Sequence, residues 1–183
     1  HCHPSMKPYG KSFSVEPGKN SQNRREKNSI WFYDSPNFFE KALQVLSGVC
    51  KFTQADCTTL AHGNVRVVCA SLYPIERGFF NNDLGTGVVS DLVDAFATSV
   101  GIDRVNYIQG IKNYFEDLVR EYEYYVKGED KVSSTDSGKF RYLLAKNFGT
   151  IEEHLESDER TILVVFSIEG LHVLHNNIDH PDV

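Results

Sequence analysis

Features that mark several large protein classes are missing from this sequence. Its longest apolar stretch, around residues 161–168, is far shorter than the roughly 20 residues that a membrane-spanning helix needs. Basic residues are in deficit, since 19 Lys and Arg stand against 25 Asp and Glu to give a net charge of −6. A duplex nucleic-acid binder needs a basic face to displace counterions, so this balance argues against that class. The remaining composition, with 40 % hydrophobic residues in a chain of 183, is typical of one globular domain.

Cysteine is also sparse: the chain has Cys2, Cys50, Cys57 and Cys69, and no C-x-x-C pair. A structural zinc knuckle and a thioredoxin motif are therefore unsupported. Cys69 lies in an apolar run, which predicts a small core residue. Cys50 and Cys57 could pair in a secreted protein, but free thiols fit this low density better. This favours a cytoplasmic location without establishing one.

Common catalytic signatures are absent as well. The sequence has no G-x-S-x-G, no P-loop, no G-x-G-x-x-G and no H-E-x-x-H. What it does have is an alternation of apolar strands and helices. Residues 64–73 and 161–168 are almost continuously apolar, which predicts strands buried on both faces, as in a parallel sheet.

Between these strands, apolar periodicity predicts helices beginning at Ser35 and covering 54–61, 88–99, 103–127 and 151–157. Residues 140–147 are amphipathic but too short for their type to be assigned. Residues 4–30 are rich in Ser, Lys, Asn, Gly and Pro, which predicts a polar loop or a mobile insertion. Helices that alternate with buried strands indicate an α/β fold.

Candidate functional residues lie at the predicted strand ends. His1 and His3 have a spacing that, on an extended segment, points both imidazoles to the same side. Glu169 directly follows the apolar run 161–168, where an unpaired buried carboxylate would be costly. Two imidazoles and one carboxylate make a good zinc site. His172, three residues further on, could contact a substrate or a metal.

These residues could also have no role in metal or substrate binding. The two N-terminal histidines could be a surface pair, and Glu169 could be a solvated strand-end carboxylate. The other histidines, His62, His154, His175 and His180, are predicted to be helix-end or surface residues.

Two segments resemble a known family. The segment His1-Cys-His-Pro-Ser-Met-Lys-Pro resembles the metal-binding end of the first barrel strand in the amidohydrolase superfamily. The segment Phe166-Ser-Ile-Glu-Gly-Leu-His172 resembles the I-E-G-G-H segment of the membrane dipeptidase (renal dipeptidase-like) metallopeptidases. The resemblance implies an α/β fold in the form of a partial (β/α)8 TIM barrel, with only its first strands and helices in this chain.

The resemblance also implies a chemistry. His1 and His3 would ligate one metal, Glu169 would bridge two divalent ions, with zinc the first choice, and His172 would support substrate binding. A metal-bridging hydroxide would attack the peptide bond of a small dipeptide substrate. This chain departs from the renal-type pattern, which has H-x-D in place of H-x-H and a second glycine in place of Leu171.

Length bears on this interpretation, because a (β/α)8 barrel takes roughly 250 residues. We therefore expect residues 1–183 to form a single incomplete TIM-barrel domain, an internal fragment of a longer dipeptidase-like protein. It would carry a polar insertion at about 10–30 and a helical region at about 103–157. The remaining metal ligands and the general acid or base would lie outside it, so the fragment alone is expected to be inactive.

Other interpretations stay open. The chain could be another amidohydrolase or a metal-dependent phosphoesterase, for which only Lys7 and Lys11 offer nearby positive charge. It could be a non-enzymatic α/β interaction protein with incidental histidines. An N-terminal copper brace is a further alternative, although such proteins are β-sandwiches. The metal, the substrate side chains and a homodimeric state are left undetermined by the sequence.

Overall fold

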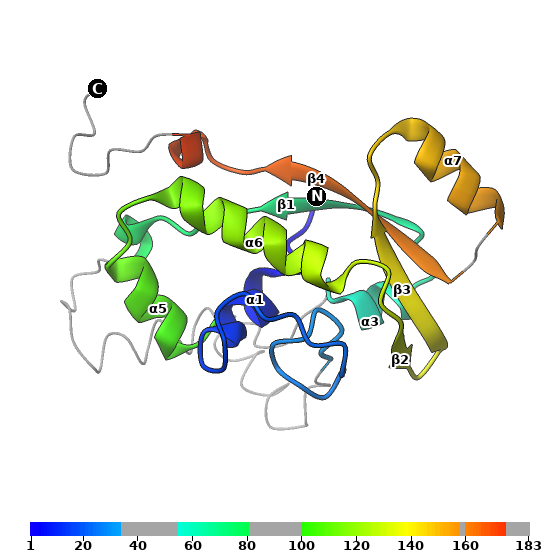
Figure 1. The fold of residues 1–183 in the computed structure, drawn as a ribbon, viewed down its shortest axis with the longest axis horizontal. Coiled ribbons are helices and arrows are strands. Elements are labelled where there is room, and N and C mark those ends of the chain that lie inside the picture. Colours follow the sequence, from blue (N-terminus) through cyan, green and yellow to red (C-terminus); the bar gives the residue numbers. More distant parts are fainter. Residues whose placement is uncertain (34–54, 81–99, 158–159, 175–183) are drawn as a thin grey trace, which may run out of the picture.

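A four-stranded mixed sheet organises the fold (Figure 1). The computed structural model describes residues 1–33, 55–80, 100–157 and 160–174. The strands lie in the order β1 (Val67–Leu72), β4 (Thr161–Ile168), β3 (Gly138–Leu144) and β2 (Ser133–Thr135). Strand β4 pairs in parallel with β1 and β3, whereas β2 pairs antiparallel with β3. A parallel bridge from Cys2 to Ala70 places the N-terminal segment on the other side of β1.

The two strands predicted from apolar runs are present, and the α/β class is confirmed. The segment at 140–147, whose type the sequence left open, contributes most of β3. Its side chains alternate, with Tyr142 and Leu144 buried in the core and Phe140 packed against it. Strand β3 precedes β4 in the chain but lies beyond it in the sheet. The described residues therefore form an open sheet and not a closed barrel.

The described residues also form five helices and two 3-10 turns. They are α1 (Met6–Ser12), α3 (Cys57–His62), η1 (Arg77–Phe80), α5 (Ile102–Gln109), α6 (Tyr114–Gly128), α7 (Phe148–Ser157) and η2 (Leu171–Leu174). The predicted helices beginning at Ser35 and at 88–99 lie outside the described residues. Among the helices that are described, none has the length and apolar character that crossing a bilayer requires.

The helix predicted over 103–127 is two helices. Gly110 ends α5, and Asn113 begins α6 by accepting hydrogen bonds from the N–H groups of Phe115 and Glu116. An asparagine side chain at this position satisfies N–H groups that have no partner within the helix. The apolar periodicity continues across residues 110–113, so it did not show that a second helix begins after Asn113.

The segment expected to be a polar insertion at about 10–30 packs against the rest of the chain. Asn20 is buried and donates to the Tyr124 carbonyl at 3.0 Å and to the Tyr142 hydroxyl at 3.1 Å. Ile30 and Trp31, at its end, are fully buried. Polar side chains can enter the interior when their hydrogen bonds are satisfied, which composition alone does not show.

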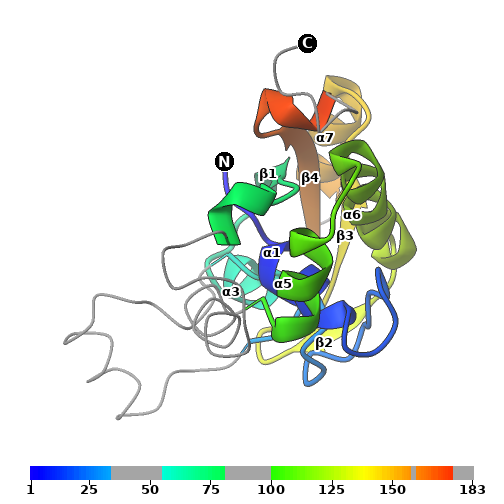
Figure 2. The same cartoon turned by 90° about the vertical axis from the view of Figure 1, so that its left-hand side faces the viewer.

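The two faces of the sheet differ in cover. Val68, Ala70 and Leu72 of β1 face the main core, to which α1, α3 and α6 also contribute. Figure 1 shows α6 running alongside β1 and β4, with α1 and α5 beneath it and α7 apart from these helices, and Figure 2 shows α1, α3 and α5 close together below β1. On the opposite face, Cys69 and Ser167 are exposed. The prediction that Cys69 is a core residue is therefore wrong, because alternation along β1 turns it away from the core.

A buried ion pair joins three of these helices. Arg104 of α5 and Asp117 of α6 are almost fully buried and share two hydrogen bonds, of 2.6 and 2.5 Å. The hydroxyl of Tyr9 in α1 donates to the same carboxylate at 2.9 Å. The Arg104 guanidinium also lies 4.8 Å from the centres of the Tyr9 and Phe13 rings. Each buried charge thus has an oppositely charged partner. This pairing offsets the free-energy cost of removing the two charges from water.

Removing one partner of this pair should destabilise the protein strongly. We expect Arg104→Met to lower the free energy of unfolding by about 3–5 kcal/mol, because it leaves the Asp117 charge buried and unpaired. The double variant Arg104→Met/Asp117→Leu should lose less, since it removes both charges. Urea unfolding at neutral pH measures both. A single variant that costs less than the double variant would contradict this account.

Candidate metal centre

Three of the side chains singled out in the sequence meet at one point. His1 Nε2 lies 2.9 Å from Glu169 Oε2, and His3 Nε2 lies 3.1 Å from the same oxygen. One ligand atom from each residue lies within 4.8 Å of the other two. Within the described ranges, this is the one group of three or more His, Cys, Asp or Glu side chains close enough to share an ion.

Strand register explains this meeting. Cys2 bridges to Ala70 and faces the core, so His1 and His3 on either side of it face the opposite side of the sheet. Glu169 follows β4 directly, and its N–H donates to the Leu72 carbonyl at 3.0 Å. The N-terminal segment, β1 and β4 therefore run side by side in the same direction. Their polar residues gather on the face where Cys69 and Ser167 are exposed.

A backbone carbonyl sets the orientation of His3. Its Nδ1 lies 3.1 Å from the Ser71 carbonyl oxygen, which can only accept, so Nδ1 carries a proton and donates. In the neutral imidazole, Nε2 then presents a lone pair toward Glu169 Oε2. Two acceptors 3.1 Å apart need a proton or a cation between them. The geometry fits either an imidazolium–carboxylate pair or a metal site in which the hydrogen bond from Nδ1 to Ser71 orients the histidine ligand.

The centre is open to solvent on one side. The side chains of His1 and Glu169 are 54 % and 43 % exposed, and that of His3 is 25 % exposed. A substrate could therefore reach an ion held here. Exposure of this degree also means that the ion pairs themselves are screened by water.

Tyr73 adds an aromatic wall that the sequence did not identify as functional. Its ring centre lies 5.7 Å from that of His3. Burial raises the pKa of the Tyr73 hydroxyl, and the negative charges of Glu76 and Glu169 raise it further. The raised pKa favours the protonated hydroxyl, which can act as a hydrogen-bond donor. Its position immediately after β1 was the available signal, since functional groups gather at the carboxyl ends of parallel strands.

His172 lies near the centre but outside the meeting point. Its Nδ1 is 3.0 Å from Glu76 Oε1, and its Nε2 is 2.9 Å from the Pro74 carbonyl oxygen. Both partners accept, so the ring makes both contacts only when it carries two protons. The Tyr73 and Tyr114 rings flank it edge-on. His172 thus ties the chain after β4 to the chain after β1, and its predicted contact with substrate would need one of these bonds to open.

The two other histidines that the structure describes, His62 and His154, do not join this group. His62 Nδ1 lies 3.0 Å from the Ser137 hydroxyl, and His154 Nδ1 lies 2.9 Å from the Thr150 carbonyl of its own helix. His175 and His180 lie outside the described residues.

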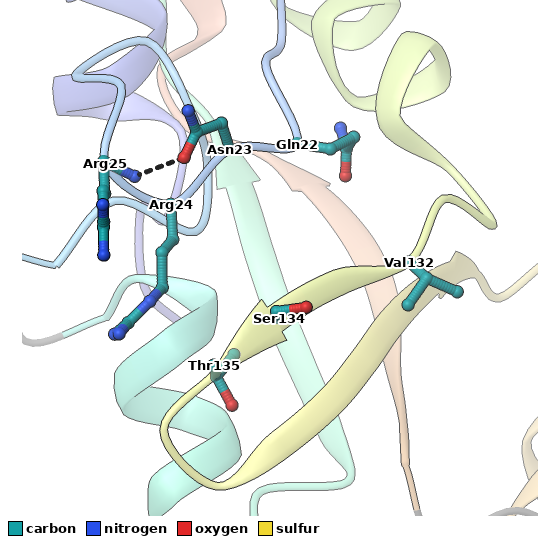
Figure 3. Close-up of a pocket in the computed structure, with 7 residues that line it drawn as sticks. All are labelled: Gln22, Asn23, Arg24, Arg25, Val132, Ser134 and Thr135. Carbon is teal, nitrogen blue, oxygen red and sulfur yellow. Dashed lines mark hydrogen bonds between the residues drawn. The ribbon is translucent and has the colours of Figure 1, made fainter.

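A separate surface cavity of about 430 Å³ lies between the loop at 22–25 and the edge strand β2 (Figure 3). The charge of Arg24 on its wall is matched by two hydrogen bonds to Asp136. The cavity shares no residue with the candidate metal centre.

No family model, curated protein or solved structure matches the chain. The geometry of the centre therefore carries the functional argument.

The three side chains should contribute little to stability when no metal is present. Because all three are partly exposed, we expect Glu169→Gln to change the free energy of unfolding by less than about 1 kcal/mol in chelator. Urea unfolding with EDTA present tests this. A loss above about 2 kcal/mol would instead indicate a structural ion-pair cluster.

Proposed function

We propose that the chain provides metal-binding residues of a metal-dependent hydrolase similar to the dipeptidases of the amidohydrolase superfamily. The observation that carries the proposal is the convergence of His1 and His3 on one oxygen of Glu169. Two imidazoles and a carboxylate suit zinc, and a catalytic zinc site keeps one position free for water or substrate. The described residues offer three ligands, which leaves that fourth position open.

The proposed fold is part of a (β/α)8 barrel. Three observations support it: the N-terminal segment, β1 and β4 are adjacent and parallel, helices pack on one face, and the polar centre lies at the carboxyl ends. In such a barrel the face that carries Cys69 and Ser167 would be the interior. The position of β3 beyond β4 is a departure from consecutive strand order.

Each residue of the centre has a distinct proposed role. His3 presents Nε2 because its Nδ1 proton is held by the Ser71 carbonyl. Glu169 directs Oε2 to both histidines and would also help to hold the second ion that the family resemblance implies. Tyr73 offers a protonated hydroxyl that can orient a substrate carbonyl or carboxylate. A bound divalent ion would supply Lewis acidity and an acidified water.

The phosphoesterase alternative is less favoured by the placement of its basic residues. Lys11 lies in α1, and its pKa is lowered mainly by burial, with Lys27 and Asp103 as its charged neighbours. Asp103 belongs to α5 and is not part of the centre. Dipeptides, with a scissile amide and terminal charges, remain the proposed substrate class.

Metal binding is the first test of this proposal. Titration of Co²⁺ into the chelator-treated protein should give one bound ion per chain with the visible absorption of low-coordinate cobalt. His3→Ala should weaken binding by about tenfold or more, because it removes the oriented ligand. His62→Ala is the matched control and should bind normally. Equal affinity in all three proteins would contradict the proposed centre.

Catalysis is tested separately in the zinc-loaded longer protein expected from the sequence, because residues 1–183 alone are expected to be inactive. Release of free amino acids from a panel of dipeptides should exceed the release by Glu169→Gln, because this variant loses the shared carboxylate. A phosphodiester substrate run in parallel distinguishes the phosphoesterase alternative. Dipeptide release that is the same in Glu169→Gln and the wild type would rule out hydrolysis by this centre.

A further inference from the structure

A second buried carboxylate on α6 is not used by the centre itself. Glu121 is 2 % exposed. Its Oε1 accepts a hydrogen bond from the Ser5 hydroxyl at 2.5 Å, and its Oε2 accepts one from the Tyr73 backbone N–H at 2.9 Å. Burying a carboxyl group is costly unless its oxygens are satisfied, and here each oxygen has a donor.

These two donors belong to the segments that hold His3. Ser5 is two residues beyond His3 and is itself fully buried. Tyr73 directly follows β1, and its ring packs 5.7 Å from the ring of His3. The segments are far apart in sequence from α6, since the two hydrogen bonds span 116 and 48 residues. One carboxyl group therefore connects the N-terminal segment, the end of β1 and the helix behind them.

We propose that Glu121 is a positioning residue for the metal centre, which holds the His3 and Tyr73 segments together so that the His3 imidazole stays aimed at Glu169. This inference rests on the proposed function, because it assumes that His1, His3 and Glu169 bind an ion. It assigns Glu121 no contact with that ion or with substrate.

Charge pairing does not account for Glu121. Arg104, the nearest buried cation, already makes two hydrogen bonds to Asp117. Burial raises the pKa of Glu121 to about 7, although the Ser5 hydrogen bond, the Arg104 charge and the Tyr73 N–H oppose this rise. The neutral carboxyl group is therefore well populated up to neutral pH. In that form it donates to the Ser5 hydroxyl oxygen and still accepts from Tyr73.

Glutamine should reproduce this arrangement, whereas leucine should not. In Glu121→Gln, the amide oxygen can accept from the Tyr73 N–H and the amide N–H can donate to Ser5. Glu121→Leu fills similar space but leaves both donors without a partner. A purely space-filling role would therefore tolerate leucine at least as well as glutamine, which separates packing from positioning.

The experiment measures Co²⁺ affinity at pH 6.5 in four proteins. The Co²⁺ affinity of Glu121→Gln should lie within about threefold of the wild-type affinity. That of Glu121→Leu should be weaker by about tenfold or more, which is typical when a residue that orients a metal ligand is lost. Leu118→Ala is the control, because Leu118 is a buried core residue of the same helix. It should lose stability while keeping its Co²⁺ affinity.

A milder variant covers the case in which Glu121→Leu does not fold. Ser5→Ala removes one of the two hydrogen bonds and should weaken Co²⁺ binding to an intermediate extent. Wild-type affinity in folded Glu121→Leu, or in Ser5→Ala where the leucine variant is unfolded, would overturn the inference. Absence of Co²⁺ binding by the wild type, or undiminished binding by His3→Ala, would instead overturn the proposed centre.

Discussion

Parallel pairing of β1 with β4 is the constraint on which the candidate centre depends. Leu72 is in register with Ile168, the last residue of β4, so the next residues along the two strands, Tyr73 and Glu169, leave the sheet at the same edge. The bridge from Cys2 to Ala70 extends this parallel arrangement to the N-terminal segment. Side-chain alternation then turns the N-terminal histidines toward Glu169, although 168 residues separate His1 from it.

Helix α6 supports this edge from the other side of the sheet. Its apolar residues join the main core, while two buried carboxylates one turn apart have different partners. Asp117 pairs with Arg104 and fixes α5, whereas Glu121 bonds to the N-terminal segment and to the residue that follows β1. A core made only of apolar groups would not specify these orientations, because hydrophobic contacts are not directional. The polar bonds from α6 therefore link core packing to the geometry of the centre.

Sequence reasoning predicted the parts of this structure that depend on local patterns. Apolar runs predicted β1 and β4. The spacing of His1 and His3, and the position of Glu169 directly after β4, pointed to these three residues as the candidate site. The position of β3 beyond β4 was not predictable, because strand order is set by long-range pairing. The exposure of Cys69 was missed for a related reason, since an apolar run does not show whether both faces are covered. The dipeptidase-like function stays a prediction, supported by the centre.

Tyr73 and Glu121 were not identified from the sequence, because their importance lies in contacts across the fold. Tyr73 could have been suspected from its place at a strand end, but nothing in the pattern of α6 distinguishes Glu121 from a solvated glutamate. Only the hydrogen bonds to Ser5 and Tyr73 do so. Helical periodicity also misplaced part of the buried face of α6, since the apolar residues Phe115, Val119 and Tyr122 are exposed. The buried face instead includes the carboxyl groups of Asp117 and Glu121.

The central claim is that His1, His3 and Glu169 together hold a divalent ion. X-ray absorption spectroscopy of the protein loaded with one equivalent of zinc tests it most directly. A centre built from these residues should give a low-coordinate zinc with nitrogen and oxygen ligands at about 2.0–2.2 Å, including the multiple-scattering signal of two imidazoles. A spectrum without imidazole scattering, or one dominated by sulfur at about 2.3 Å, would contradict it.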